Sequence, residues 1–137
     1  MTEYTSEIKT IPYGDERIFS MLSDLSNLER VKDRIPKDHI KDFTFDCDSC
    51  SLEVSPMGKV HFQIIDREPY KTIKFETTNS PFPLTLWIQL KQTDANVTKM
   101  KMTVRTELNP LLKTMIAKPL QEGLNKIADA IATIPFE

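Results

Sequence analysis

The chain has 137 residues and a formal charge of −2, with 18 Lys and Arg against 20 Asp and Glu. This length suits a single domain, residues 1–137, with one core. The slight acidic excess argues against nucleic acid as a partner, because nucleic-acid surfaces attract basic proteins. Since the sequence shows neither a membrane-spanning apolar run nor a secretory signal, we expect a cytoplasmic protein without integral membrane contact.

The first predicted elements are a short strand and two short helices. The strand covers residues 5–11 and ends at Pro12, which interrupts strand pairing. Ser26 and Glu29 form a capping box, which predicts a second helix that ends before Pro36. The first helix is indicated by apolar residues at helical spacing and by two carboxylates in its first turn: Ile18, Phe19, Leu22 and Leu25, with Asp15 and Glu16.

Between His39 and Leu108 the apolar residues recur every second position, which predicts six antiparallel strands joined by short turns. Turn-forming residues separate the strands at positions 48–49, 55–58, 66–70, 79–83 and 94–96. Each strand therefore offers one apolar face and one polar face.

The last element is a long helix from Asn109 to Ile134, with Asn109 as its N-cap and Pro110 as its first residue. Pro119 and Gly123 lie within its apolar stripe and predict a bent helix with a gap at its midpoint, which either admits a ligand or allows close contact with the sheet. The stripe consists of Leu112, Ile116, Leu120, Leu124, Ile127, Ile131 and Ile134; Lys118, Gln121, Glu122, Asn125 and Asp129 fall on the opposite side.

This element order predicts an α+β fold in which one face of an antiparallel sheet is covered by the last helix. Residues 11–12, 16–19 and 22–28 (Ile-Pro, Glu-Arg-Ile-Phe and Leu-Ser-Asp-Leu-Ser-Asn-Leu) resemble the opening of the SRPBCC superfamily, and the element order matches over essentially the whole chain. That superfamily has the helix-grip fold of START domains, the birch pollen allergen family and polyketide cyclases. The resemblance implies a curved seven-stranded antiparallel sheet around the C-terminal helix, two short helices after the first strand, and an apolar cavity.

Inward-facing apolar residues are the candidate cavity wall for a lipid, an isoprenoid or an aromatic polyketide-like compound. They are Phe43, Phe45, Phe62, Phe75, Leu86, Ile88, Met100, Met102, Val104, Met115 and Leu120. The alternation of turns in a meander also places Met57, Phe82, Leu111 and Leu112 at one rim. This rim is either the ligand's route into the cavity or an apolar plug.

Cys47 and Cys50 form a C-x-x-C pair, but no second pair completes a zinc site and no helix begins between them, as a thioredoxin-type pair requires. We interpret both as small buried apolar residues across a hairpin turn. The sequence predicts no metal site and no cofactor. Two cysteines are also too few for a disulfide framework.

No residue is assigned a catalytic role. By strand parity His61 points to the solvated face, and His39 lies in a loop, so neither is well placed as a general base. Thr77 and Thr106 are the main inward polar groups; they either orient a ligand or bond to each other across the sheet.

Trp87 is predicted on the outer face of the sheet, where it forms either a partner or homodimer surface or a site covered by a Lys stem. A strip of basic residues near it is interrupted by glutamates and suits a solvated strand face better than a phosphate site: Lys91, Lys99, Lys101 and Arg105.

Three functions are compatible with these patterns. We favour a non-enzymatic domain that binds a small apolar molecule between sheet and helix. The alternatives are a cyclase/dehydrase-like enzyme, and an interaction domain with a filled core that docks through Trp87 or Phe82. The volume of the cavity separates the third hypothesis from the other two.

Overall fold

The fold is taken from a computed structural model, which describes residues 2–28, 40–54, 58–78, 83–107, 110–134 and 136, without the side chains of 40–43, 54 and 58. The elements in this part of the chain are β1 (Thr2–Thr5), β2 (Lys9–Ile11), α1 (Asp15–Leu22), β3 (Ile40–Phe45), β4 (Ser49–Val54), β5 (Gly58–Glu68), β6 (Thr72–Thr78), β7 (Leu84–Asp94), β8 (Val97–Thr106) and α2 (Pro110–Ala132).

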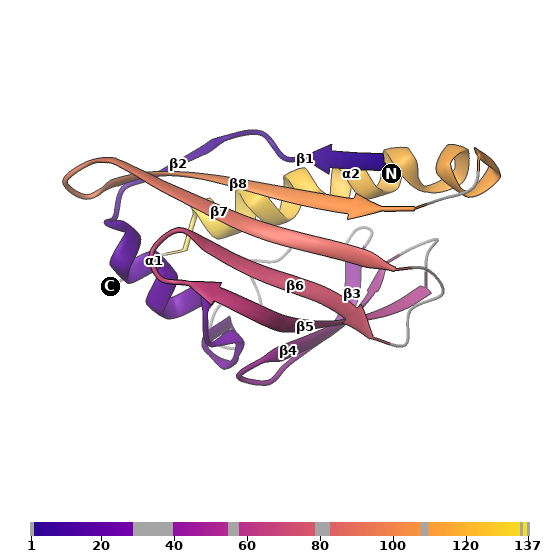
Figure 1. The fold of residues 1–137 in the computed structure, drawn as a ribbon, viewed down its shortest axis with the longest axis horizontal. Coiled ribbons are helices and arrows are strands. Elements are labelled where there is room, and N and C mark those ends of the chain that lie inside the picture. The colour runs from indigo at the N-terminus through magenta and orange to yellow at the C-terminus, as the bar shows by residue number, and fades with distance from the viewer. Residues whose placement is uncertain are drawn as a thin grey trace.

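The strands form one antiparallel sheet in the order β1-β8-β7-β6-β5-β4-β3, and β2 also pairs with β8. Strands β3 to β8 follow one another as hairpins, as their period-two pattern predicts. Figure 1 shows α2 running behind this sheet, alongside β1, β2 and β8. The predicted α+β helix-grip architecture is therefore confirmed.

The first predicted strand is in fact two strands. Thr5 pairs with Thr103 and Lys9 pairs with Met100, so the first strand advances four residues while β8 advances three. The extra residue makes a bulge between β1 and β2, and Ile8 within it is 65% exposed. Because the bulge adds one residue, it reverses the parity of β2 relative to an unbroken strand.

Helix α1 forms as predicted, but a distant strand supplies its cap. The N-cap position is Gly14, which has no side chain to accept a hydrogen bond. Instead the Gln92 side-chain oxygen in β7 accepts the Asp15 N–H at 2.8 Å. The apolar face of the helix is buried through Ile18, Phe19 and Leu22.

The second predicted helix falls mainly on residues 29–35, which lie outside the described residues. Its first part, residues 25–28, forms a single 3₁₀ turn. Ser26 lies inside this turn and is not its cap, because Asp24 Oδ1 accepts the Ser26 N–H at 3.1 Å. Asp24 therefore has the capping role that the sequence pattern assigns to Ser26.

Helix α2 is held against the edge of the sheet by its polar side. Gln121 Nε2 donates to the Thr5 carbonyl at 2.8 Å, and Asn125 Oδ1 accepts the Glu7 N–H at 3.0 Å. One turn further on, Asp129 forms an ion pair with Lys9. These residues, four apart on the side of the helix opposite the apolar stripe, attach α2 to β1, β2 and the bulge between them.

The apolar stripe of α2 faces the sheet and is largely buried through Ile116, Leu120, Leu124 and Ile131. It joins inward-facing strand residues in one core. Among the helices of the described ranges, none has the length and apolar character needed to cross a bilayer.

Candidate functional site

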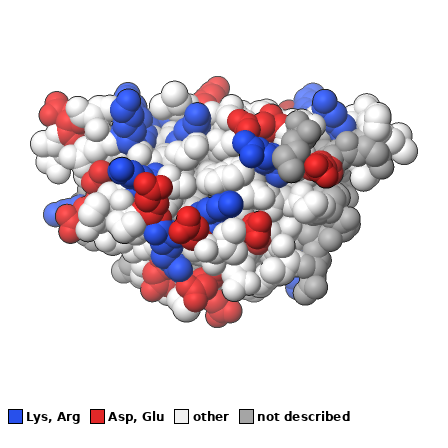
Figure 2. Space-filling view, viewed as in Figure 1, with Lys and Arg blue, Asp and Glu red and all other residues white. Residues whose placement is uncertain are grey.

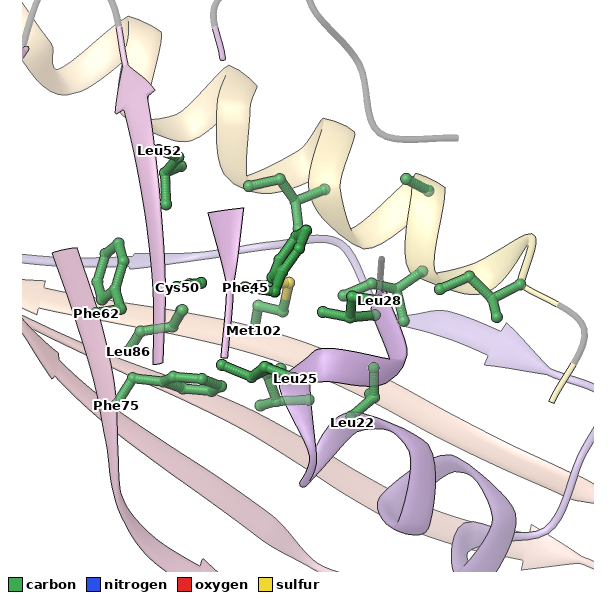
Figure 3. Close-up of a pocket in the computed structure, with 15 residues that line it drawn as sticks. Leu22, Leu25, Leu28, Phe45, Cys50, Leu52, Phe62, Phe75, Leu86 and Met102 are labelled. Atoms are coloured by element: carbon green, nitrogen blue, oxygen red, sulfur yellow. The ribbon is translucent and has the colours of Figure 1, made fainter. Parts of the chain in front are cut away.

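An apolar cavity lies between the sheet and α2. Its larger compartment has a volume of about 100 Å³. Figure 3 shows side chains from the strands and from the segment after α1 converging on this space beneath the helix. Six of the predicted wall residues line it: Phe45, Phe62, Phe75, Leu86, Ile88 and Met102.

A smaller compartment of about 60 Å³ adjoins the first, beneath the middle of α2. Pro119 and Gly123 line it, so the gap predicted at these two residues is present. Val104 and Leu120, two more of the predicted wall residues, also line this compartment. A glycine without a side chain and a proline within a helix leave space that a run of Leu or Ile would fill.

Two predicted wall residues lie elsewhere. Met100 is completely buried but lines neither compartment. Met115 is 54% exposed, so its assignment to the wall is wrong. Ile116 takes the inward position at this turn of α2, which places the preceding residue about 100° around the helix. Phe43 lies in β3, but its side chain is outside the described residues.

The predicted rim is only partly described. Met57 and Phe82 lie outside the described residues. Leu111 is 72% exposed and Leu112 is half-buried, and neither lines a compartment of the cavity. The rim as an access route therefore stays a prediction.

The sequence did not predict the contribution of the segment after α1. Leu22, the last residue of α1, and Leu25 and Leu28 in the segment after it cover one side of the larger compartment. Two bonds hold the segment on the sheet: the Leu25 N–H donates to the Cys47 carbonyl at 3.0 Å, and Arg67 Nε donates to the Ser23 carbonyl at 3.0 Å. The regular spacing of the three leucines was the available signal. Leu52, Ile127, Ala130, Ile131 and Ile134 are further lining residues.

The two cysteines differ: Cys47 is exposed, so its interpretation as buried is wrong, and Cys50 is half-buried. It lies within the hairpin turn, where the Asp46 N–H donates to the Ser49 carbonyl at 2.8 Å. The neighbouring Asp48 carboxylate raises the pKa of the Cys47 thiol. Cys50 lines the larger compartment, and burial raises its pKa to about 12.

The inward hydroxyl groups bond to the backbone where β7 begins. Thr77 Oγ1 accepts the Leu84 N–H at 3.0 Å, and Thr106 Oγ1 donates to the Pro83 carbonyl at 2.7 Å. Neither threonine lines the cavity compartments. Their hydroxyls therefore stabilise the start of β7. This role differs from the two roles expected from the sequence, which were to orient a ligand or to bond to each other.

His61 points away from the apolar cavity, as strand parity predicts. Its Nδ1 is hydrogen-bonded to Ser51 Oγ, the directly paired residue on β4, at 2.6 Å. His39 lies outside the described residues. No cluster of three or more His, Cys, Asp or Glu side chains suited to a metal ion occurs within the described ranges.

Trp87 is half-buried on the outer face between two cations. Lys74 Nζ lies 5.6 Å from its ring centroid, and the guanidinium carbon of Arg105 lies 5.2 Å from it. Arg105 also pairs with Glu3 at 3.1 Å. Figure 2 shows acidic and basic residues interspersed over this face. The tryptophan is therefore covered by cationic side chains, and the basic strip is broken by acidic neighbours.

Comparison of the sequence with protein-family models and with curated proteins finds no match. Comparison of the structure does find similar folds. A START superfamily protein from Mycobacterium smegmatis has a TM-score of 0.70 at 15% identity, with 95% of this chain and 94% of that chain covered. A protein from Thermus thermophilus has a TM-score of 0.69 at 18% identity, with 96% of this chain and 94% of that chain covered.

Norcoclaurine synthase from Thalictrum flavum, in complex with dopamine and hydroxybenzaldehyde, has a TM-score of 0.69 at 14% identity. The match covers 96% of this chain and 85% of that chain. At these identities the similarity concerns the fold. The chain has a START-like helix-grip fold of the SRPBCC type.

Proposed function

We propose that this protein binds a small apolar molecule in the cavity between its sheet and α2. The observation that carries the proposal is the cavity itself, whose two adjoining compartments are lined by apolar side chains. Close-packed protein cores rarely leave voids of this size. The open volume argues against an interaction domain with a filled core.

The chemistry of the wall favours binding over proton transfer. Among the described lining residues the ionisable group is the Cys50 thiol, whose pKa of about 12 keeps it protonated at neutral pH. A general acid or base works best with a pKa near the working pH. A wall of this kind can exclude water and shape a ligand, but it offers little means of moving a proton.

The volume favours a ligand smaller than a typical lipid. Binding pockets for drug-sized molecules span roughly 300–1,000 Å³, whereas an engineered apolar cavity of about 150 Å³ holds benzene. The larger compartment, at about 100 Å³, is of the latter order. A single-ring hydrocarbon or a short aliphatic molecule therefore suits it best. Norcoclaurine synthase, which has the same fold, is known with dopamine and hydroxybenzaldehyde, which supports a role in binding small molecules.

Ala130→Leu tests the proposal, with toluene as the probe. Ala130 is buried on α2 and lines the larger compartment, so a leucine there would occupy the space for the ligand. We expect at least tenfold weaker toluene binding in an NMR titration. Because the added side chain fills a void, the free energy of unfolding should rise by about 0.5–2 kcal/mol.

Ala132→Leu is the matched control. Ala132 is half-buried at the end of the same helix but lines neither compartment. The Ala132→Leu variant should bind toluene as strongly as the wild type does. If Ala130→Leu loses toluene binding although it is more stable than the wild type, the loss cannot be attributed to unfolding. Absence of toluene binding by the wild-type protein, or equal binding by the wild type and Ala130→Leu, would refute the proposal.

A further inference from the structure

The two compartments of the cavity share part of their walls. Leu52, Phe62, Leu86, Met102 and Ile127 each line both of them. Four of these residues project from strands β4, β5, β7 and β8, and Ile127 faces them from α2. The shared residues therefore mark a boundary across the cavity, with the larger compartment on one side and the smaller on the other.

The two sides of this boundary have different walls. Cys50, Phe75 and Ala130 line only the larger compartment, and Val104, Pro119 and Gly123 line only the smaller one. A ligand that occupies both must pass between the helix and the strands at the shared residues. The length that the cavity accepts is therefore decided at this boundary.

Met102 and Ile127 are the boundary residues best placed to control passage. Met102 lies in the strand next to the sheet edge, and its unbranched thioether can adopt several shapes in an irregular space. Ile127 is the boundary residue contributed by the helix and is half-buried, in contrast to its buried neighbours Leu124 and Ala128.

We infer that Met102 and Ile127 are specificity-determining residues that limit the ligand to the length of one compartment. This inference rests on the proposed function and names its ligand class: single-ring or similarly short apolar molecules are accepted, and two-ring molecules are excluded. When the division is shortened, the compartments become one continuous space that admits a longer ligand.

The test compares toluene with biphenyl in Ile127→Ala, using NMR titrations of the full chain. Relative to wild type, the ratio of biphenyl affinity to toluene affinity should rise at least tenfold. Ile116→Ala is the matched control, because Ile116 is buried on the same helix and lines neither compartment. It loses the same atoms and should keep the wild-type preference for toluene.

A second pair of variants covers the case in which Ile127→Ala does not fold. Met102→Ala should also gain biphenyl binding at least tenfold, whereas Met100→Ala should not. Met100 and Met102 lie on the same face of β8 and are both buried, but only Met102 lines the cavity. The comparison therefore isolates the boundary from the general effect of truncating a core methionine.

The outcomes separate the two proposals. Toluene binding with an unchanged toluene-to-biphenyl preference in Ile127→Ala and Met102→Ala would overturn the division and leave the proposed function standing. The same gain in Ile116→Ala or Met100→Ala would also overturn it, because the effect would then be unspecific. If wild type and variants bind neither probe, both proposals fail.

Discussion

Cys50 places a thiol in an apolar wall, and its ionisation reports on that wall. Burial disfavours the thiolate and raises the pKa from 9.0 to about 12. The folded state therefore keeps this proton at pH values where the unfolded state loses it. The resulting contribution to stability is complete below about pH 9 and is lost as the pH rises from there toward 12.

In a Cys47→Ser variant, Cys50 should react slowly with a neutral maleimide. A rise of the pKa from 9.0 to about 12 leaves roughly 1,000-fold less thiolate at pH 8, and the thiolate is the reactive form. Between pH 9 and pH 10 the rate constant should rise about tenfold, because with a pKa of about 12 the thiolate fraction still increases in proportion to hydroxide. A rise of less than about twofold, as for a thiol with a pKa of 9.0, would show that Cys50 is not in the apolar wall. Cys50→Ser, which leaves the exposed Cys47, provides the fast reference.

At the level of the helix, α2 combines three functions, one on its polar side and two on its apolar side. Its polar side, with Gln121, Asn125 and Asp129, attaches it to the first strands. Its apolar side closes the core, and the Pro119–Gly123 stretch leaves the smaller compartment open. The helix thus fixes one wall of the cavity while leaving part of it unfilled.

Gly123→Ala should raise the free energy of unfolding by about 0.5–1 kcal/mol, measured by chemical denaturation. Alanine has the higher helix propensity, and the smaller compartment leaves room for one methyl group. Gly14→Ala is the contrasting variant, because its Cβ would lie 3.3 Å from Gln92 Oε1, the atom that caps α1. It should lower stability by about 0.5 kcal/mol. A destabilising Gly123→Ala would mean that the space beside Gly123 is already filled.

What the sequence could predict at this level depended on periodicity. The alternation of strands β3 to β8 and the apolar stripe of α2 each extend over many residues, so a local exception does not hide them. The bulge before Lys9, the cap of α1 by Gln92 and the pairing of Asn125 with Glu7 could not be predicted. Each depends on a contact between residues far apart in the chain, and no local pattern encodes the partner.

For the whole molecule, the element order was sufficient to predict the helix-grip fold, but not the shape of the cavity. The alternation of side chains between the two faces of a strand correctly placed Phe62, Leu86 and Met102 on the cavity side of the sheet. It could not distinguish Met100 from Met102, because both point inward and only the packing of α2 decides which one borders empty space. Met115 was misplaced for a related reason, since a small rotation of the helix moves a residue from the wall to solvent.

The most direct test of the central claim is native mass spectrometry of the protein purified from the cells that produce it. We predict that wild type retains a small apolar molecule, released by organic solvent, and that Ala130→Leu prepared in the same way retains much less. The filled larger compartment of the variant would explain this difference. A wild-type protein that carries no additional mass, or an equal amount of the same molecule on both proteins, would contradict binding in this cavity.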